Sequence, residues 1–174
     1  FIITIIDLEY VRRQFPAFST ETLAGQCFFE NAGGSYMCKP VIERSRNYFE
    51  KRKVQPYYAF KASMAAGDEM DLAKQRFARY LNVNIEEVLF GPSTSQNTYV
   101  LSQALLEKIS TGDAIIISAQ EHEANSGVWR KLGNHGVEIR IWPVDQENGR
   151  LQLDNLFPLL DSKVKLVAMT HCSN

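Results

Sequence analysis

The sequence predicts an α/β protein in which helices flank a mostly parallel sheet, and three features indicate this fold class. From Ile85 onward, short apolar runs alternate with amphipathic segments of helix length, which is the order of repeated strand–helix units. Residues 114–118 are apolar on both faces, as in a strand that is covered by helices on either side. Residues 137–142 alternate between apolar and polar side chains, which indicates a strand nearer an edge of the sheet.

Local signals set the order of the elements. Asp7 is suited to cap a first helix, Pro16 ends that helix, and Pro40 is suited to the first turn of the next one. In chain order we then expect a strand over 27–30, helices over 40–53 and 68–81, a strand over 88–90, a helix over 95–109, a strand over 114–118, a helix around 129–132, a strand over 137–142, a short helix over 153–160 and a buried strand over 164–169.

Composition excludes several classes of protein. The chain has 174 residues, 45% of them apolar and 22% charged, which is typical of a soluble globular protein with a real core. A net charge of -1 with interspersed signs gives no basis for nucleic-acid or membrane binding, and no apolar run is long enough to span a bilayer. The three cysteines are odd in number and lack metal-binding spacing. We therefore expect no metal site, no disulfide framework and a reducing, cytoplasmic setting.

The segment that follows residues 88–90 has the features of an anion-binding helix start. Gly91 and Pro92 are followed by Ser93, Thr94 and Ser95, and a helical pattern begins at once. The first N–H groups of a helix have no intrahelical partner and carry the positive end of the helix dipole, so a phosphate binds there readily. Simple capping by Ser or Thr is the alternative interpretation.

Polar clusters also follow the other two buried strands. Residues 119–125 contain His122 between two glutamates, and residues 170–174 end in Asn174. Because the carboxyl ends of parallel strands meet at one edge of a sheet, these clusters and the helix start should lie together and suit a small polar ligand that carries a phosphate. His122 is either an imidazole that faces this ligand or an ordinary capping or solvated loop histidine.

At these clusters the sequence resembles the class V aminotransferase group of fold-type I pyridoxal-phosphate enzymes, and within it the cysteine desulfurase and selenocysteine lyase branch. The motifs that carry the resemblance are Phe29-Glu30-Asn31-Ala32-Gly33-Gly34-Ser35, Phe90 to Gln96, Gly112-Asp113-Ala114-Ile115-Ile116-Ile117-Ser118 with Glu121-His122-Glu123-Ala124-Asn125, and Thr170-His171-Cys172-Ser173-Asn174. The first is similar to the family's Leu-Asp-Asn-Ala-Ala/Gly element at the active-site entrance, and the second to its Arg-Gly-Thr-Thr-Glu phosphate cup. The third is similar to the family's Gly-Asp-x-Ile-Ile-Ile-Ser and Glu-His-His-Ala-Asn motif, and the fourth to its Thr-His-Val-Ser-Asn motif. Pro92, Gln96 and Glu123 depart from the family pattern.

The resemblance implies the large domain of a fold-type I enzyme, with pyridoxal 5'-phosphate as cofactor and an amino acid as small-molecule substrate. It implies that Thr94 and Ser95 bind the phosphate of the cofactor. It further implies that His122 stacks on the cofactor ring and takes part in catalysis, and that Asn174 contacts the phenolic oxygen.

The resemblance also sets the expected domains. Residues 1–66 would contribute to a small domain or to the active-site entrance, where Asn31 and Ala32 would contact the substrate, and residues 67–174 would form the first part of the cofactor-binding large domain. The family's cofactor-binding lysine lies beyond the last motif. We therefore expect a truncated large domain from a longer, homodimeric protein, and no activity from these 174 residues alone. Cysteine or selenocysteine β-elimination is the first choice of reaction. A class V aminotransferase or epimerase is one alternative, and a non-catalytic scaffold or dimerisation module is the other.

Overall fold

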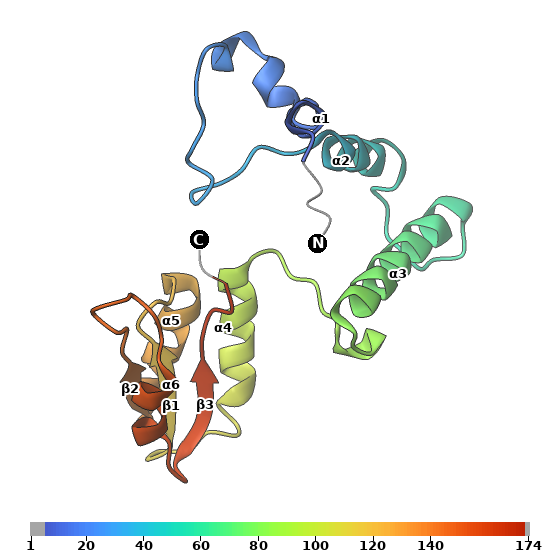
Figure 1. Ribbon diagram of the computed structural model, residues 1–174. Helices are drawn as coiled ribbons and strands as arrows, with labels where there is room; N and C mark the ends of the chain where they lie inside the picture. The colour runs from blue at the N-terminus through green and yellow to red at the C-terminus, as the bar shows by residue number, and fades with distance from the viewer. Residues whose placement is uncertain (1–5, 173–174) are drawn as a thin grey trace. The chain divides into compact units, whose positions relative to one another are not determined.

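The computed structural model describes residues 6–172, which form two compact units divided between Leu89 and Phe90 (Figure 1). The first unit contains α1 (Leu8–Arg13), α2 (Lys39–Lys51), α3 (Lys61–Leu81) and 3-10 turns at Pro16–Ser19, Glu21–Leu23 and Ile85–Glu87. The second unit contains α4 (Thr94–Leu105), β1 (Ala114–Ser118), α5 (Glu123–Arg130), η4 (Lys131–His135), β2 (Glu138–Trp142), α6 (Leu153–Leu156), η5 (Phe157–Leu159) and β3 (Val164–Ala168). The domain boundary expected after residue 66 concerns the complete protein and stays a prediction. Within residues 6–172, no helix has both the length and the apolar character that crossing a bilayer requires.

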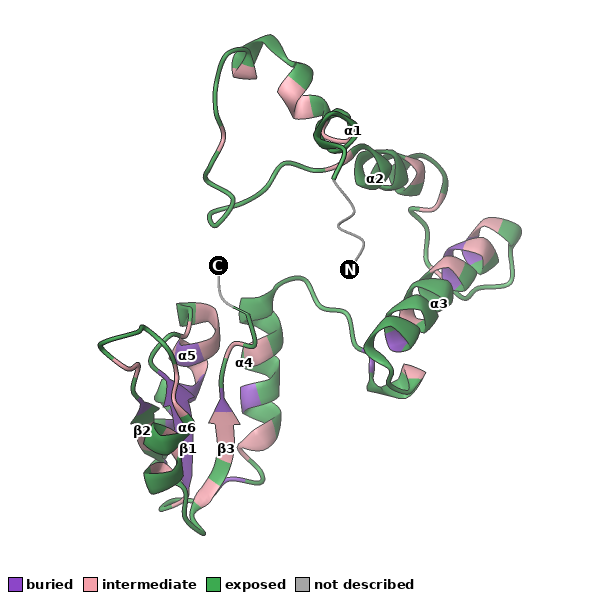
Figure 2. Cartoon of the chain, in the orientation of Figure 1, coloured by how far each residue is buried: buried purple, intermediate pink, exposed green. Residues whose placement is uncertain are grey.

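Ion pairs join α2 to α3 in the first unit. Glu69 of α3 accepts a hydrogen bond from Arg44 of α2 at 2.8 Å and another from Arg52, at the end of α2, at 2.9 Å. The residues that α3 buries are small: Ser63, Ala66, Gly67 and Ala78. Figure 2 accordingly shows most of this unit in the colour of exposed residues. The first unit therefore has little hydrophobic core of its own.

The loop before α3 folds back onto the first turn of the helix. The buried Ser63 hydroxyl donates to the carbonyl oxygen of Gln55 and accepts the N–H of Tyr58, with a distance of 2.7 Å for the second bond. Because these contacts order the chain ahead of the predicted helix start at residue 68, α3 begins earlier, at Lys61.

Two predicted strands, over 27–30 and 88–90, are wrong. Neither segment pairs with another strand in the described part of the chain. Val88 is buried, but Leu89 is 86% exposed, so the apolar run at 88–90 does not form a continuous buried surface. A lone strand leaves its N–H and C=O groups unpaired, and an apolar run therefore becomes a strand only where a partner lies beside it.

The second unit is built on a parallel sheet with strand order β2-β1-β3 among the described residues. Ser118 at the end of β1 lies opposite Trp142 at the end of β2, and Ile117 lies opposite Ala168 at the end of β3. The carboxyl ends of the strands therefore meet at one edge, which confirms the predicted parallel α/β arrangement and the predicted edge position of β2.

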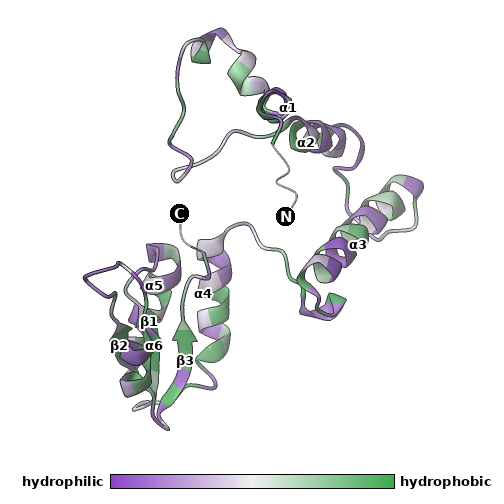
Figure 3. Ribbon diagram, in the orientation of Figure 1, coloured by the Kyte–Doolittle hydropathy of each residue, from purple (hydrophilic) through white to green (hydrophobic). Residues whose placement is uncertain are grey.

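The core of the second unit lies between β1 and the helices α4 and α5. All five residues of β1 are buried, which confirms that this strand is covered on both faces. The buried cluster on one face comprises Ile109, Ile115, Ile117, Trp129, Leu132, Val137 and Ala168. β3 is mostly hydrophobic in Figure 3 but only partly buried in Figure 2. Among the described residues no further strand covers its outer edge, so the expected full burial of β3 is not reached.

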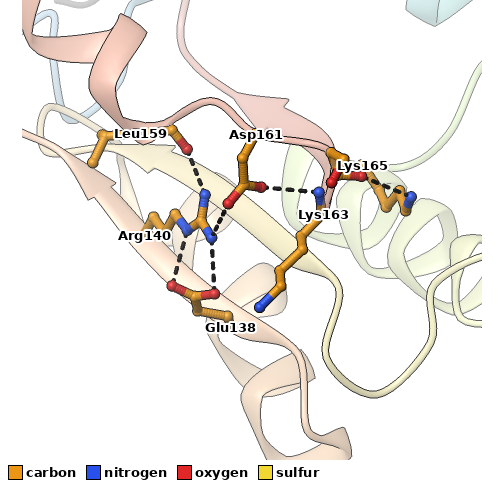
Figure 4. A network of polar contacts seen from close by, with 7 residues as sticks. Glu138, Arg140, Leu159, Asp161, Lys163 and Lys165 are labelled. Atoms are coloured by element: carbon orange, nitrogen blue, oxygen red, sulfur yellow. Dashed lines mark hydrogen bonds and ion pairs between the residues drawn. The ribbon is translucent and has the colours of Figure 1, made fainter.

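Arg140 of β2 ties the segment before β3 to the sheet (Figure 4). Its guanidinium donates two bonds to Glu138 and one to Asp161, each of 2.9 Å, and a fourth to the carbonyl oxygen of Leu159 at 2.6 Å. Hydrogen bonds from this guanidinium hold the pKa of both carboxyl groups below their ordinary values. Glu138 begins β2 and Asp161 precedes β3, so the network lies toward the amino ends of the strands and stabilises the sheet there.

Candidate active site

The start of α4 carries two backbone N–H groups that the helix itself does not use. Ser93 caps the helix: its hydroxyl accepts the N–H of Gln96 at 3.2 Å, and its carbonyl oxygen accepts that of Asn97 at 2.9 Å. The N–H groups of Thr94 and Ser95 precede these and have no acceptor one turn back. Both residues are exposed, so two N–H groups and two hydroxyls are gathered at the positive end of the helix dipole.

Gly91 leaves room beside this helix start for the side-chain amide of Asn97. A Cβ added at Gly91 would lie 1.6 Å from Oδ1 of Asn97, which is far closer than any real contact. Any larger residue at position 91 would displace the Asn97 amide from the first turn of α4. The close approach therefore explains the glycine at the beginning of the predicted phosphate cup.

His122 lies at the corresponding position of the next helix, as the N-cap of α5. Its Nδ1 accepts the N–H of Ala124 at 3.0 Å, and its side chain is exposed. An Nδ1 that accepts a hydrogen bond carries no proton, so in the neutral ring the proton is on Nε2. The structure thus gives His122 the capping role that the sequence left as an alternative, while the ring face and Nε2 stay available to a ligand.

Thr98 joins the first turns of α4 and α5. Its hydroxyl lies 2.6 Å from the carbonyl oxygen of Ala124, and 2.9 and 3.2 Å from those of Thr94 and Ser95. A hydroxyl has one proton to donate, and the shortest distance assigns it to Ala124 in the neighbouring helix. The helix start at Thr94 and the helix capped by His122 are therefore held side by side.

Glu121 connects the ends of β1 and β3 to the first turn of α5. Its Oε1 accepts the hydroxyl of Ser118 at 2.6 Å and the N–H of Thr170 at 2.5 Å. Its Oε2 accepts the side-chain amide of Asn125 at 2.6 Å and the hydroxyl of Thr170 at 2.7 Å. Partial burial raises the pKa of this carboxyl group, but the hydrogen bonds from these partners outweigh burial and hold the pKa below its ordinary value. Glu121 is therefore a carboxylate at neutral pH.

The structure brings together part of the predicted site. Thr94, Ser95 and His122 lie on the linked first turns of α4 and α5 in the second unit. Asn31 and Ala32 lie in an exposed turn of the first unit, where Asn31 accepts the hydroxyl of Ser35 at 3.2 Å. Asn174 lies outside the described residues.

Sequence reasoning missed Glu121 and Thr98, the two residues that hold the clusters together. The sequence places Glu121 only within a motif of the family resemblance and Thr98 only within the helix expected over 95–109. A signal for each was present: Glu121 directly precedes the N-cap residue, and Thr98 lies four residues after Thr94, on the same helix face.

The second unit thus defines an α/β protein with a parallel sheet. The starts of α4 and α5 and the end of β3 lie at the carboxyl edge of that sheet. The sequence pattern of the aminotransferase class-V family matches residues 27–174, and the chain therefore belongs to that family. This confirms the family that the motifs at the strand ends predicted.

Several known proteins have sequences that align with almost the whole of this chain. It is 35% identical over 174 residues to the aminotransferase-like protein FGM3 of Gibberella zeae, an alignment that covers 97% of this chain and 42% of that protein. It is 32% identical to the cysteine desulfurase-like protein ustD of Aspergillus flavus, with 98% of this chain and 39% of that protein covered. A cysteine desulfurase of Cronobacter sakazakii is 29% identical, with 97% and 42% covered. The chain spans about two fifths of the length of these relatives.

Solved structures show the same fold. The apo structure of a cysteine desulfurase from Thermococcus onnurineus has a TM-score of 0.86 and 24% identity, covering 98% of this chain and 42% of that one. The cysteine desulfurase CsdA from Escherichia coli has a TM-score of 0.74 and 18% identity, covering 94% and 41%. A C-DES mutant that carries glycine covalently linked to its PLP cofactor has a TM-score of 0.68 and 20% identity, covering 90% and 39%. The fold predicted from the sequence, that of the fold-type I large domain, is confirmed.

Proposed function

We propose that the full-length protein is a pyridoxal-phosphate-dependent enzyme that acts on an amino acid, with cysteine or selenocysteine β-elimination as the favoured reaction. One observation carries the proposal: the bond from Thr98 to Ala124 holds the open start of α4 beside the helix that His122 caps. An anion-binding helix start suits the phosphate of such a cofactor, and an imidazole face suits its flat ring. Membership of the aminotransferase class-V family supports the same cofactor.

The donor set at the start of α4 fits a phosphate group. Thr94 and Ser95 would each offer a backbone N–H and a hydroxyl, and neither side chain is large enough to exclude a phosphate. The hydrogen bond from the Gln96 N–H to the Ser93 hydroxyl keeps the helix start open, because it satisfies the next N–H without covering the first two. These residues would fix the cofactor at its phosphate and leave its ring to other groups.

His122 would bind the ring of the cofactor. Its capping bond to Ala124 restricts rotation of the imidazole and directs the proton to Nε2, so a flat face and one N–H donor would be presented in a fixed orientation. When bound, pyridoxal phosphate supplies an electron sink that makes the Cα of an amino acid reactive. His122 could then hold or transfer a proton at Nε2. Asn174 at the phenolic oxygen, and Asn31 and Ala32 at the substrate, remain proposals from the family resemblance.

Titration of the full-length protein with pyridoxal phosphate tests the proposal. Replacing both Thr94 and Ser95 by alanine should raise the dissociation constant about a hundredfold, because two hydrogen bonds to a charged group are lost. Alanine favours helices, so the fold should be retained. Ser162→Ala is the matched control, since this serine is exposed and precedes β3 at the other end of the strand. Equal affinity in the double variant and the wild type would refute the phosphate site.

The substrate decides between the candidate reactions. Release of sulfide from cysteine, or selenide from selenocysteine, would support β-elimination, whereas amino-group transfer to a keto acid would support the aminotransferase alternative. The similarity to an aminotransferase-like protein favours testing transfer first among the alternatives, with epimerisation next. A full-length protein that binds no pyridoxal phosphate would favour the scaffold or dimerisation module. That the 174 residues alone are inactive also stays a prediction, as do the homodimer and the cytoplasmic setting, which sedimentation and cell fractionation would test.

A further inference from the structure

Glu121 is built into the carboxyl edge of the sheet more firmly than any role as a charged turn residue requires. Its carboxylate accepts four hydrogen bonds of 2.5 to 2.7 Å, from the end of β1, from the first turn of α5 and from Thr170, the second residue after the end of β3. The segment after β3 leaves the sheet at the arrowhead in Figure 1, and Thr170 gives both its N–H and its hydroxyl to Glu121. Glu121 thus sets the direction of the segment after β3 relative to His122, the residue that directly follows Glu121 in the chain.

Two of the four hydrogen-bond donors to Glu121 cannot act as acceptors instead. The N–H of Thr170 is backbone and always donates. The amide of Asn125 is fixed because its Oδ1 accepts the indole N–H of Trp129 at 3.1 Å, which leaves Nδ2 to face Glu121. One fixed donor faces Oε1 of Glu121 and the other faces Oε2. A glutamine at this position would therefore place its NH2 against a fixed donor in either orientation, so only a carboxylate satisfies all of its neighbours.

We propose that Glu121 is a positioning residue that aligns the ring-binding side of the cofactor site, His122 and the segment after β3, without contacting the phosphate-binding start of α4. This role rests on the proposed function. It predicts different effects on the affinities for two ligands: loss of the carboxylate should weaken binding of the whole cofactor while leaving binding of phosphate alone unchanged.

The test uses Glu121→Gln in the full-length protein. We expect the dissociation constant for pyridoxal phosphate to rise about tenfold, and that for inorganic phosphate, measured by displacement of the cofactor, to change by less than about twofold. The induced circular dichroism of the bound cofactor should also decrease, because the ring is less firmly oriented. Glu123→Gln is the matched control. Glu123 begins α5, two residues after Glu121, and also pairs with a neighbour, Arg130 at 2.5 Å, but has no bond to the described residues after β3.

Each result decides the role. If both ligands bind more weakly by the same factor, or if neither affinity changes, Glu121 is not a positioning residue, although the proposed function survives. If the wild-type protein binds no pyridoxal phosphate, the proposed function and this role fail together. Should Glu121→Gln not fold, Thr170→Val provides the decision, because it removes the hydroxyl bond and keeps the backbone one. We expect a rise of about threefold for pyridoxal phosphate alone, and an unchanged dissociation constant would overturn the role.

Discussion

Replacing His122 by asparagine separates two contributions that one imidazole combines. The Nδ1 of His122 accepts the N–H of Ala124 at 3.0 Å and caps α5, while the ring is proposed to stack on the cofactor. Loss of an N-cap costs about 1 kcal/mol, and asparagine is among the best N-cap residues. Loss of an aromatic stacking contact also costs about 1 kcal/mol, which corresponds to about fivefold in a dissociation constant. His122→Asn should therefore keep the stability of the cofactor-free protein and bind pyridoxal phosphate about fivefold more weakly.

His122→Ala is the matched comparison, since alanine removes both the cap and the ring. It should show the same loss of affinity together with a free energy of unfolding that is lower by about 1 kcal/mol. Urea unfolding of the cofactor-free protein measures the free energy of unfolding, and fluorescence titration with pyridoxal phosphate measures the affinity. If His122→Asn binds the cofactor as tightly as the wild type does, the ring has no stacking role and His122 is a helix cap alone.

Three further predictions concern the surroundings of the site. Thr98→Val removes the side-chain donor to the carbonyl oxygen of Ala124, so urea unfolding should show a free energy of unfolding that is lower by about 1 kcal/mol, and an unchanged midpoint would contradict a stabilising link between α4 and α5. The pKa of Glu121 is lower in the folded state than its ordinary value of 4.5, so its contribution to stability is complete above about that pH and is lost as the pH falls through the lower folded-state pKa. Thermal unfolding as a function of pH should therefore be steeper below pH 4.5 in the wild type than in Glu121→Gln, and identical profiles would disprove this assignment. Arg140→Met removes four hydrogen bonds, two of them to the segment before β3 and two to Glu138, and should lower the unfolding temperature, whereas the affinity for pyridoxal phosphate should stay the same because the network lies toward the amino ends of the strands. A large loss of affinity in this variant would show that the two ends of the sheet are coupled.

The sequence was informative where one physical pattern had one structural solution. An apolar run such as Ile115–Ile117, followed by a polar turn and a helix, is stable only as a strand buried between helices, and β1 is buried throughout. The alternation over 137–142 fits a strand with one partly exposed face, and β2 lies at the edge of the described sheet. The hydroxyl residues at 93–95 likewise predicted a helix start, which is where α4 begins.

The sequence was less informative where the answer depended on a distant partner. The runs at 27–30 and 88–90 have strand composition, but pairing needs a neighbouring strand, and none lies beside them in the described chain. The position of Glu121 before an N-cap residue does not identify its partners, because Thr170 donates two of its four hydrogen bonds and lies 49 residues away. Only the packing of β3 beside β1 brings that donor within reach.

The sequence by itself determined the α/β class, the family and the residue types at each strand end, because hydrophobic periodicity and helix caps act over a few neighbouring residues. The tertiary structure decided which of those polar groups meet and that Glu121 and Thr98 join separate elements. These outcomes depend on hydrogen bonds between segments far apart in the chain, whose geometry is fixed only when the strands and helices pack together.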